Sequence, residues 1–112
     1  TKILISKFTD LHEMKSAPFV EVWPGKLQNL PRYLEIWSPE LQLVDGKWYV
    51  YFALYNDPVG TERMYVIEAT ADDPQGDYEY KGMLTSTPDC WAIDGSVMTM
   101  PDGEKYFIWS GW

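Results

Sequence analysis

The sequence predicts an all-β chain. Along its 112 residues, apolar and polar side chains alternate in short runs that are bounded by Gly, Pro, Asn and Asp, which is the pattern of half-buried strands. No stretch keeps the period of an amphipathic helix for three turns, and helix is limited to at most one turn near Asp10–Met14. The expected strands, in chain order, are residues 2–8, 19–23, 39–44, 48–55, 63–70, 78–84, 94–100 and 105–109.

The turns between these runs support antiparallel hairpins. Phe19–Trp23 alternates with a period of two, as expected of a strand. Asp45-Gly46 separates the third run from the fourth, and Asp102-Gly103 separates the seventh from the eighth. Asp-Gly between apolar runs is a strong hairpin signal. Asp73-Pro74-Gln75-Gly76 is a turn sequence between the fifth and sixth runs.

An internal repeat narrows the fold class. Residues 45–51 match residues 102–108, 57 positions later, and residues 3–10 weakly resemble residues 65–72. The repeating unit of about 60 residues holds four short strands, and ring-like repeats of four-stranded sheets are β-propeller blades.

About two such blades fit into the chain, whereas a propeller ring needs about four to eight. The chain is therefore expected to be a β-propeller fragment whose remaining blades lie elsewhere. Its expected parts are the end of one blade (1–37), a whole blade (38–84) and the start of the next (85–112). A small antiparallel sandwich is the alternative.

Composition excludes several classes of function. The 17 acidic and 9 basic residues give a net charge of −8, which argues against binding to a nucleic acid backbone. One Cys (Cys90) and one His (His12) are too few for a disulfide framework or for a metal site rich in Cys or His. No apolar run approaches the ~20 residues of a membrane span. We expect no cofactor, no metal, no nucleic acid and no membrane partner.

The acidic composition is compatible with a substrate that carries no charge. Aromatic residues make up 16% of the chain, and rings combined with carboxylates are common in sugar-binding clefts. Composition alone favours the simpler interpretation, in which the rings form the core and the acids the surface.

Two motifs stand ahead of the two Asp-Gly hairpins. They are Ile36–Leu41 and Trp91–Ser96, and both open the first strand of a repeat, which in a propeller lines the central axis where ligands bind. The offset of 57 makes Asp94 the counterpart of Trp37, and a shift of a few residues places it beside Glu40. Apolar neighbours should leave Asp94 poorly hydrated, and such an acid can tune a second carboxyl across a small cleft. The alternative is a turn acid that caps the preceding loop.

These motifs resemble glycoside hydrolase family 43 over nearly the whole chain. Ile36-Trp37-Ser38-Pro39-Glu40-Leu41 and the hairpin after it resemble the Trp-Ala-Pro-Glu motif and second blade of that family. Trp91–Ser96 and Tyr106–Trp112 resemble its third blade, in the arabinofuranosidase-like branch. Two departures stand out: Ser38 replaces the usual alanine, and Gly95 replaces a proline that often follows the aspartate.

The resemblance implies a five-bladed propeller that hydrolyses arabinan, arabinoxylan or xylan side chains with inversion, in a secreted or periplasmic enzyme. The family uses an Asp base, a Glu general acid, and an Asp that orients the acid and modulates its pKa. Only the modulating Asp maps onto this chain, at Asp94. The resemblance places Trp37 and Glu40 near the sugar, and we expect Trp91 and Ile93 to bind substrate too.

Because the base and the acid would lie outside the chain, we expect the isolated chain to be an inactive part of an arabinofuranosidase- or xylosidase-like glycosidase. A non-catalytic carbohydrate-binding or interaction propeller module is the alternative.

Overall fold

The computed structural model describes residues 1–30, 35–56, 61–84 and 90–112 and shows three antiparallel sheets. The first sheet pairs β1 with β2, the second has the order β3-β4-β5-β6, and the third pairs β7 with β8. The elements are β1 (Ile3–Ser6), the 3-10 turn η1 (Leu11–Glu13), β2 (Phe19–Trp23), β3 (Glu35–Val44), β4 (Lys47–Asn56), β5 (Thr61–Ala69), β6 (Tyr78–Met83), β7 (Ala92–Thr99) and β8 (Lys105–Gly111). In the part of the chain that is described, no helix is long and apolar enough to cross a bilayer.

The all-β prediction is confirmed, and each of the eight expected runs contains a strand. Three strands begin two or more residues earlier than the pattern predicts: β3 begins at Glu35, β5 at Thr61 and β7 at Ala92. In β3 and β7 the cause is a β-bulge near the start of the strand, which interrupts the alternation of apolar and polar residues. The expected blade boundaries stay predictions, and the residues just after the second, 85–89, lie outside the described chain.

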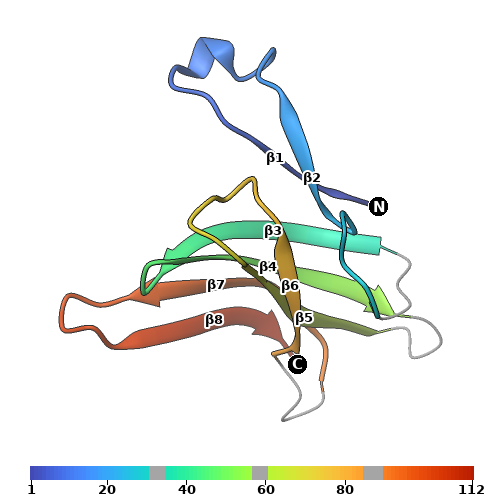
Figure 1. Cartoon of the computed structure of the whole chain (residues 1–112). Coiled ribbons are helices and arrows are strands. Elements are labelled where there is room, and N and C mark those ends of the chain that lie inside the picture. Colours follow the sequence, from blue (N-terminus) through green and yellow to red (C-terminus); the bar gives the residue numbers. More distant parts are fainter. Residues whose placement is uncertain (31–34, 57–60, 85–89) are drawn as a thin grey trace.

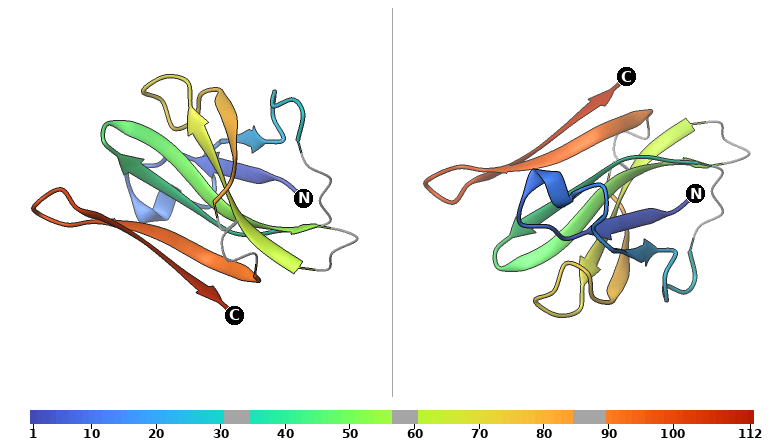
Figure 2. Two further views of the ribbon diagram at one scale, coloured as in Figure 1. Left: turned by 90° about the horizontal axis from the view of Figure 1, so that it is seen from below. Right: turned by 90° about the horizontal axis from the view of Figure 1, so that it is seen from above.

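The four-stranded sheet lies between the two hairpins (Figure 1). In that view the β1–β2 hairpin lies above the sheet and the β7–β8 hairpin below it. Figure 2 shows the β7–β8 hairpin along one side of the sheet from two further directions. This succession of three separate sheets differs from the two layers of the sandwich alternative, and it is the arrangement expected of neighbouring blades.

Alternation along β4 explains why both faces of the sheet are covered. Val50, Phe52 and Leu54 are buried in a cluster with Trp23 of β2, whereas Tyr51 and Ala53 belong to a second cluster with Ala92 of β7. Since successive side chains of a strand point to opposite faces, one apolar strand supplies two cores.

The two Asp-Gly turns have different geometries. Asp45 and Gly46 have φ values of 50° and 75°, and Val44 pairs directly with Lys47, so they form the two-residue hairpin turn that needs positive φ at both positions. Asp102-Gly103 instead lies in a longer loop, because the last pair of the hairpin joins Thr99 to Lys105. The Lys105 Nζ atom lies 3.0 Å from Asp45 Oδ1, which links the two turns.

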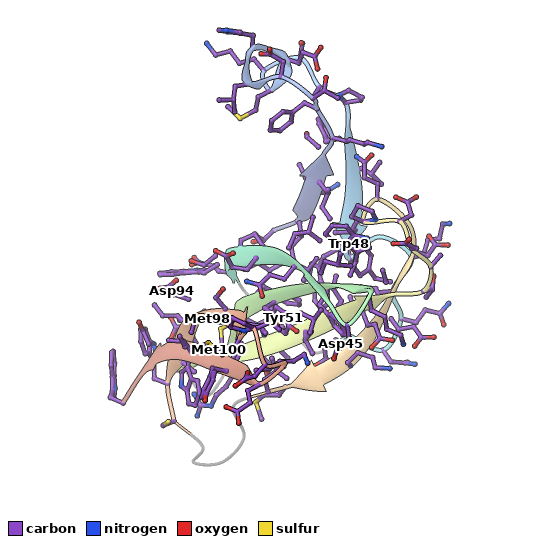
Figure 3. All side chains as sticks on the ribbon, turned by 90° about the vertical axis from the view of Figure 1, so that its left-hand side faces the viewer. Asp45, Trp48, Tyr51, Asp94, Met98 and Met100 are labelled. Carbon is purple, nitrogen blue, oxygen red and sulfur yellow. The ribbon has the colours of Figure 1, made fainter. Side chains whose placement is uncertain are left out.

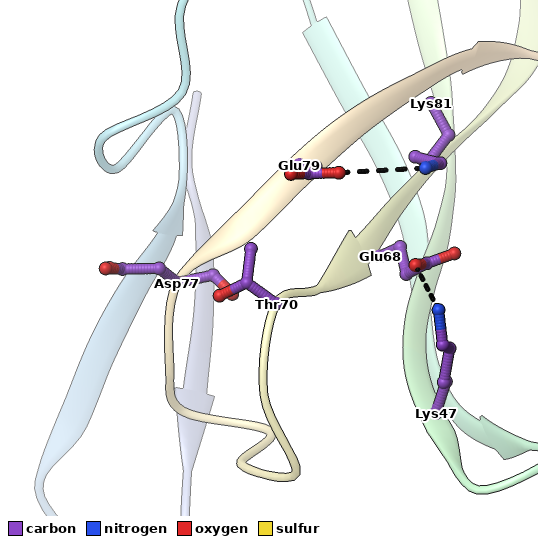
Figure 4. Close-up of polar contacts among 6 residues, drawn as sticks. All are labelled: Lys47, Glu68, Thr70, Asp77, Glu79 and Lys81. Carbon is purple, nitrogen blue, oxygen red and sulfur yellow. Dashed lines mark hydrogen bonds and ion pairs between the residues drawn. The ribbon is translucent and has the colours of Figure 1, made fainter.

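Polar contacts near the strand ends stabilise the four-stranded sheet (Figure 4). The Lys47 Nζ atom donates a hydrogen bond of 2.9 Å to Glu68 Oε1. This bond raises the pKa of Lys47 and is the main cause that lowers the pKa of Glu68. After β5, the backbone N–H and the hydroxyl of Thr70 both donate to the carbonyl of Asp77, at 2.9 and 3.1 Å, and close the loop to β6.

Burial of three tyrosines makes the fold sensitive to alkali. It raises the pKa of Tyr51, Tyr78 and Tyr80 to about 12, because a phenolate loses hydration in the apolar layers. An unfolded tyrosine releases its proton near pH ~10, so the unfolded state binds fewer protons between pH ~10 and about 12. Stability should therefore fall across that interval.

We expect Tyr51→Phe to remove part of the tyrosinate absorbance that develops near pH 12 in the folded protein. An ultraviolet pH titration of both proteins measures this amplitude. An unchanged amplitude near pH 12, with the loss falling near pH ~10 instead, would contradict the burial of this phenol.

Candidate functional site

Two matching β-bulges form the centre of the site. In β3, Ser38 and Pro39 lie between the paired residues Trp37 and Glu40. In β7 the equivalent bulge lies between Ile93 and Ser96. A bulge bends its strand and re-aims its side chains, and bulges are frequent next to active sites.

The first residue of each bulge has a left-handed backbone. The φ values are 47° at Ser38 and 56° at Asp94. Asp tolerates this conformation better than most residues because its short side chain can hydrogen-bond locally. The structure therefore matches Asp94 to Ser38, one position from the Trp37 that the offset of 57 indicates. The offset measured at the turns differs because the two hairpin loops have different lengths.

Ser38 and Asp94 contact each other directly. The Ser38 hydroxyl donates a hydrogen bond of 2.6 Å to Asp94 Oδ1, and the two residues are 56 positions apart. Figure 3 shows Asp94 at the opposite end of the stacked sheets from Asp45. Ser38 is a candidate site residue that the motifs did not single out, although it holds the same place in its motif as Asp94.

Asp94 is exposed, which corrects the expectation that it is poorly hydrated. The residue Ala92, two positions earlier, is fully buried, and Ile93 is half-buried against the same apolar layer. At Asp94 the left-handed backbone turns the side chain away from that layer. The apolar neighbours thus support the backbone of Asp94 and leave its carboxylate at the surface.

Gly95 explains one departure from the family motif. It is buried, and a Cβ atom at this position would lie 2.5 Å from Phe107 Cζ and 2.7 Å from Met64 Cε. Both distances are shorter than real Cβ contacts allow, so any larger residue would have to displace these side chains. Gly95 therefore lets β7 lie close to the sheet directly beside Asp94.

A second set of hydrogen bonds fixes β3 against β7. The Gln42 Nε2 atom donates to Ser96 Oγ at 2.6 Å, and the backbone N–H of Val97 donates to Gln42 Oε1 at 3.0 Å. These contacts are partly buried and lie further along the same two strands, so they set the register in which the bulges meet.

The expected substrate-binding residues surround the bulges at the beginning of their strands. Trp37 is 43% exposed, and its Nε1 donates a hydrogen bond of 2.8 Å to Glu35 Oε2. Glu40 is exposed beyond the β3 bulge. Trp91 stacks on Trp112 with ring centroids 4.0 Å apart and an interplanar angle of 14°. The structure thus brings Asp94 to Ser38, and leaves two aromatic surfaces near the bulges.

The described residues contain no candidate metal site, because no group of three or more His, Cys, Asp or Glu side chains among them could hold an ion. Cys90 is half-buried just before β7, and His12 lies in η1, at the far end of the β1–β2 hairpin.

Comparisons with known proteins identify the family of the chain and several of its relatives. The family model of the glycosyl hydrolases family 43 matches residues 1–112. The chain is 30% identical over 111 residues to an extracellular exo-α-(1→5)-L-arabinofuranosidase of Streptomyces avermitilis, covering 97% of this chain and 23% of that protein. It is 26% identical over 110 residues to α-L-arabinofuranosidase 43 of Humicola insolens, and this match covers 97% of this chain and 22% of that protein. An extracellular exo-α-(1→5)-L-arabinofuranosidase of Streptomyces chartreusis is 36% identical over 77 residues, and this match covers 67% of this chain and 23% of that protein.

The chain thus spans less than a quarter of the length of these relatives. Family 43 is a β-propeller family, and the antiparallel sheets of two to four strands described above are consistent with its blades. Because the family model covers every residue, the chain belongs to glycosyl hydrolase family 43.

Proposed function

We propose that the chain is part of an inverting α-L-arabinofuranosidase, in which Asp94 orients the general acid and raises the pKa of that acid. The observation that carries this proposal is the Asp94 carboxylate, exposed on a left-handed bulge and held by Ser38 of the neighbouring sheet. A side chain whose function was only to cap its own turn would need no partner 56 residues away.

The chemistry needs a carboxylate of this kind. In an inverting glycosidase one carboxyl protonates the leaving oxygen while another activates water, and the two lie roughly 6.5–9.5 Å apart. A negative charge beside the acid raises its pKa by like-charge repulsion. An acid tuned toward neutrality keeps its proton until the glycosidic oxygen takes it. Asp94 acts on the acid and does not itself touch the reacting atoms.

The substrate proposed is an arabinofuranosyl linkage of a plant polysaccharide such as arabinan. Support comes from the relatives, whose names specify arabinofuranosidases. Trp37 offers an exposed ring for the sugar, the stacked pair of Trp91 and Trp112 offers a second aromatic surface, and Glu40 offers a carboxylate for its hydroxyls. Two relatives are named extracellular, so we propose a secreted enzyme.

The acid and the base come, in this proposal, from blades beyond the described sheets of a five-bladed ring. Support comes from the β7–β8 hairpin and the residue after it, which expose large apolar side chains that a further blade would cover. They are Met98, Tyr106, Ile108, Trp109 and Trp112.

The isolated 112-residue chain should therefore release no phenol from aryl α-L-arabinofuranosides or aryl xylosides, whereas the longer protein with all its blades should hydrolyse the arabinofuranoside. Absorbance of the released phenolate measures both. Turnover by the isolated chain that Asp94→Asn abolishes would contradict the proposal, because acid and base would then lie within these residues. A longer protein that binds arabino-oligosaccharides without cleaving them would show a binding module instead.

A further inference from the structure

We infer that Ser38 is a positioning residue: its hydroxyl holds the Asp94 carboxylate in the orientation that acts on the general acid. This inference rests on the function proposed above. The distance of 2.6 Å between Ser38 Oγ and Asp94 Oδ1 lies in the short range of hydrogen bonds from a hydroxyl to a charged carboxylate. Such bonds are stronger and more directional than those between neutral groups.

The backbone at Ser38 is bent in a way that serves this contact. Its φ of 47° is unfavourable for serine, which lacks the tolerance that Gly, Asn and Asp have for the left-handed region. Residues keep such unfavourable conformations only where the surrounding structure holds them there, and they are frequent at functional sites. Here the bulge directs the Ser38 side chain across the gap between two sheets to Asp94.

The hydrogen bond restrains one oxygen of the carboxylate. A carboxylate without a partner rotates freely about its last carbon–carbon bond, so both the distance and the direction of its charge toward a neighbour vary. With Oδ1 held by Ser38, rotation breaks the bond, and Oδ2 keeps a constant position. A fixed charge raises the pKa of a neighbouring acid more than a rotating one does, because the repulsion depends on distance.

A purely structural role for this hydroxyl is disfavoured by two observations. Ser38 and Asp94 are both exposed, and exposed polar contacts contribute little to stability. The register between β3 and β7 is already set by Gln42, which is bonded to Ser96 and Val97 in a partly buried position. Removing the Ser38 hydroxyl should therefore leave the sheets packed as they are.

The test uses the longer protein with all its blades and compares Ser38→Ala with Ser38→Gly. Both changes remove the hydroxyl, but only glycine accepts a positive φ without strain. Each should lower kcat on an aryl arabinofuranoside about 10-fold and shift the alkaline limb of the pH profile of kcat/KM to lower pH, because the acid loses repulsion. A substrate with a more acidic leaving phenol needs less help from the acid, so its kcat should fall less.

The control variants separate this role from packing. Ser6→Ala removes an exposed hydroxyl from β1 and should leave kcat and the pH profile unchanged. In the Asp94→Asn background, Ser38→Ala should cause little further loss, because residues that act as a unit are not additive. Additive losses, or a loss in Ser38→Ala that glycine restores, would overturn the inference.

The result also separates this inference from the proposed function. If Asp94→Asn lowers kcat while both Ser38 variants keep the parent kcat and pH profile, only the role of Ser38 is wrong. If Asp94→Asn itself leaves kcat unchanged, the proposed function fails together with the inference.

Discussion

Asp94→Asn should lower kcat on an aryl α-L-arabinofuranoside by roughly 10²- to 10⁴-fold in the protein with all its blades, the range that a positioned general acid contributes. The change removes the negative charge and little else. Asn tolerates the left-handed backbone found at φ 56°, and its carbonyl oxygen accepts the Ser38 hydrogen bond as Oδ1 does. The alkaline limb of the pH profile should move to lower pH, because the pKa of the acid falls when the repulsion is lost.

A matched control for this charge lies on the same hairpin. Asp102 is an exposed aspartate whose Oδ1 accepts the backbone N–H of Glu104 at 3.0 Å in the turn between β7 and β8. Asp102→Asn removes the same charge at a distance from the bulge and should leave kcat unchanged. Equal losses in the two variants would mean that overall charge, and not the position of Asp94, determines the rate.

Phe52→Ala should lower the free energy of unfolding by about 3–5 kcal/mol. Phe52 is fully buried at the middle of β4, with its ring centroid 4.8 Å from that of Trp23 and 6.4 Å from that of Tyr65. Truncation removes the apolar contacts that join the β1–β2 hairpin to the four-stranded sheet and leaves a cavity. A loss of this size is a large part of the 5–15 kcal/mol that stabilises a typical domain.

Urea denaturation followed by tryptophan fluorescence measures this loss as a lower midpoint. Leu11→Ala is the control, since Leu11 is 77% exposed in η1 and a surface truncation should stay within about 0.5 kcal/mol. If the midpoint of Phe52→Ala matches that of Leu11→Ala, the ring does not bridge the two sheets as described.

The strands and their pairing could be predicted because the signals are local. A period of two marks each strand through the alternation of buried and exposed side chains, and Asp45-Gly46 identifies a hairpin by the backbone angles that only a few residues adopt. The early parts of β3 and β7 could not be predicted, because the bulges at Ser38 and Asp94 break that period. The repeat found at the turns also misplaced the partner of Asp94 by one position, since loop length changes the offset between two equivalent strands.

The sequence by itself determined the all-β class, the hairpins, the family and the choice of Asp94, since each follows from residue types and their order. Only the tertiary structure decided that Ser38 holds Asp94, that the carboxylate is exposed, and that Gly95 makes room for Phe107 and Met64. The physical reason is that these features depend on contacts between separate sheets and on a left-handed backbone. Neither is encoded by the residues next to Asp94 in the chain.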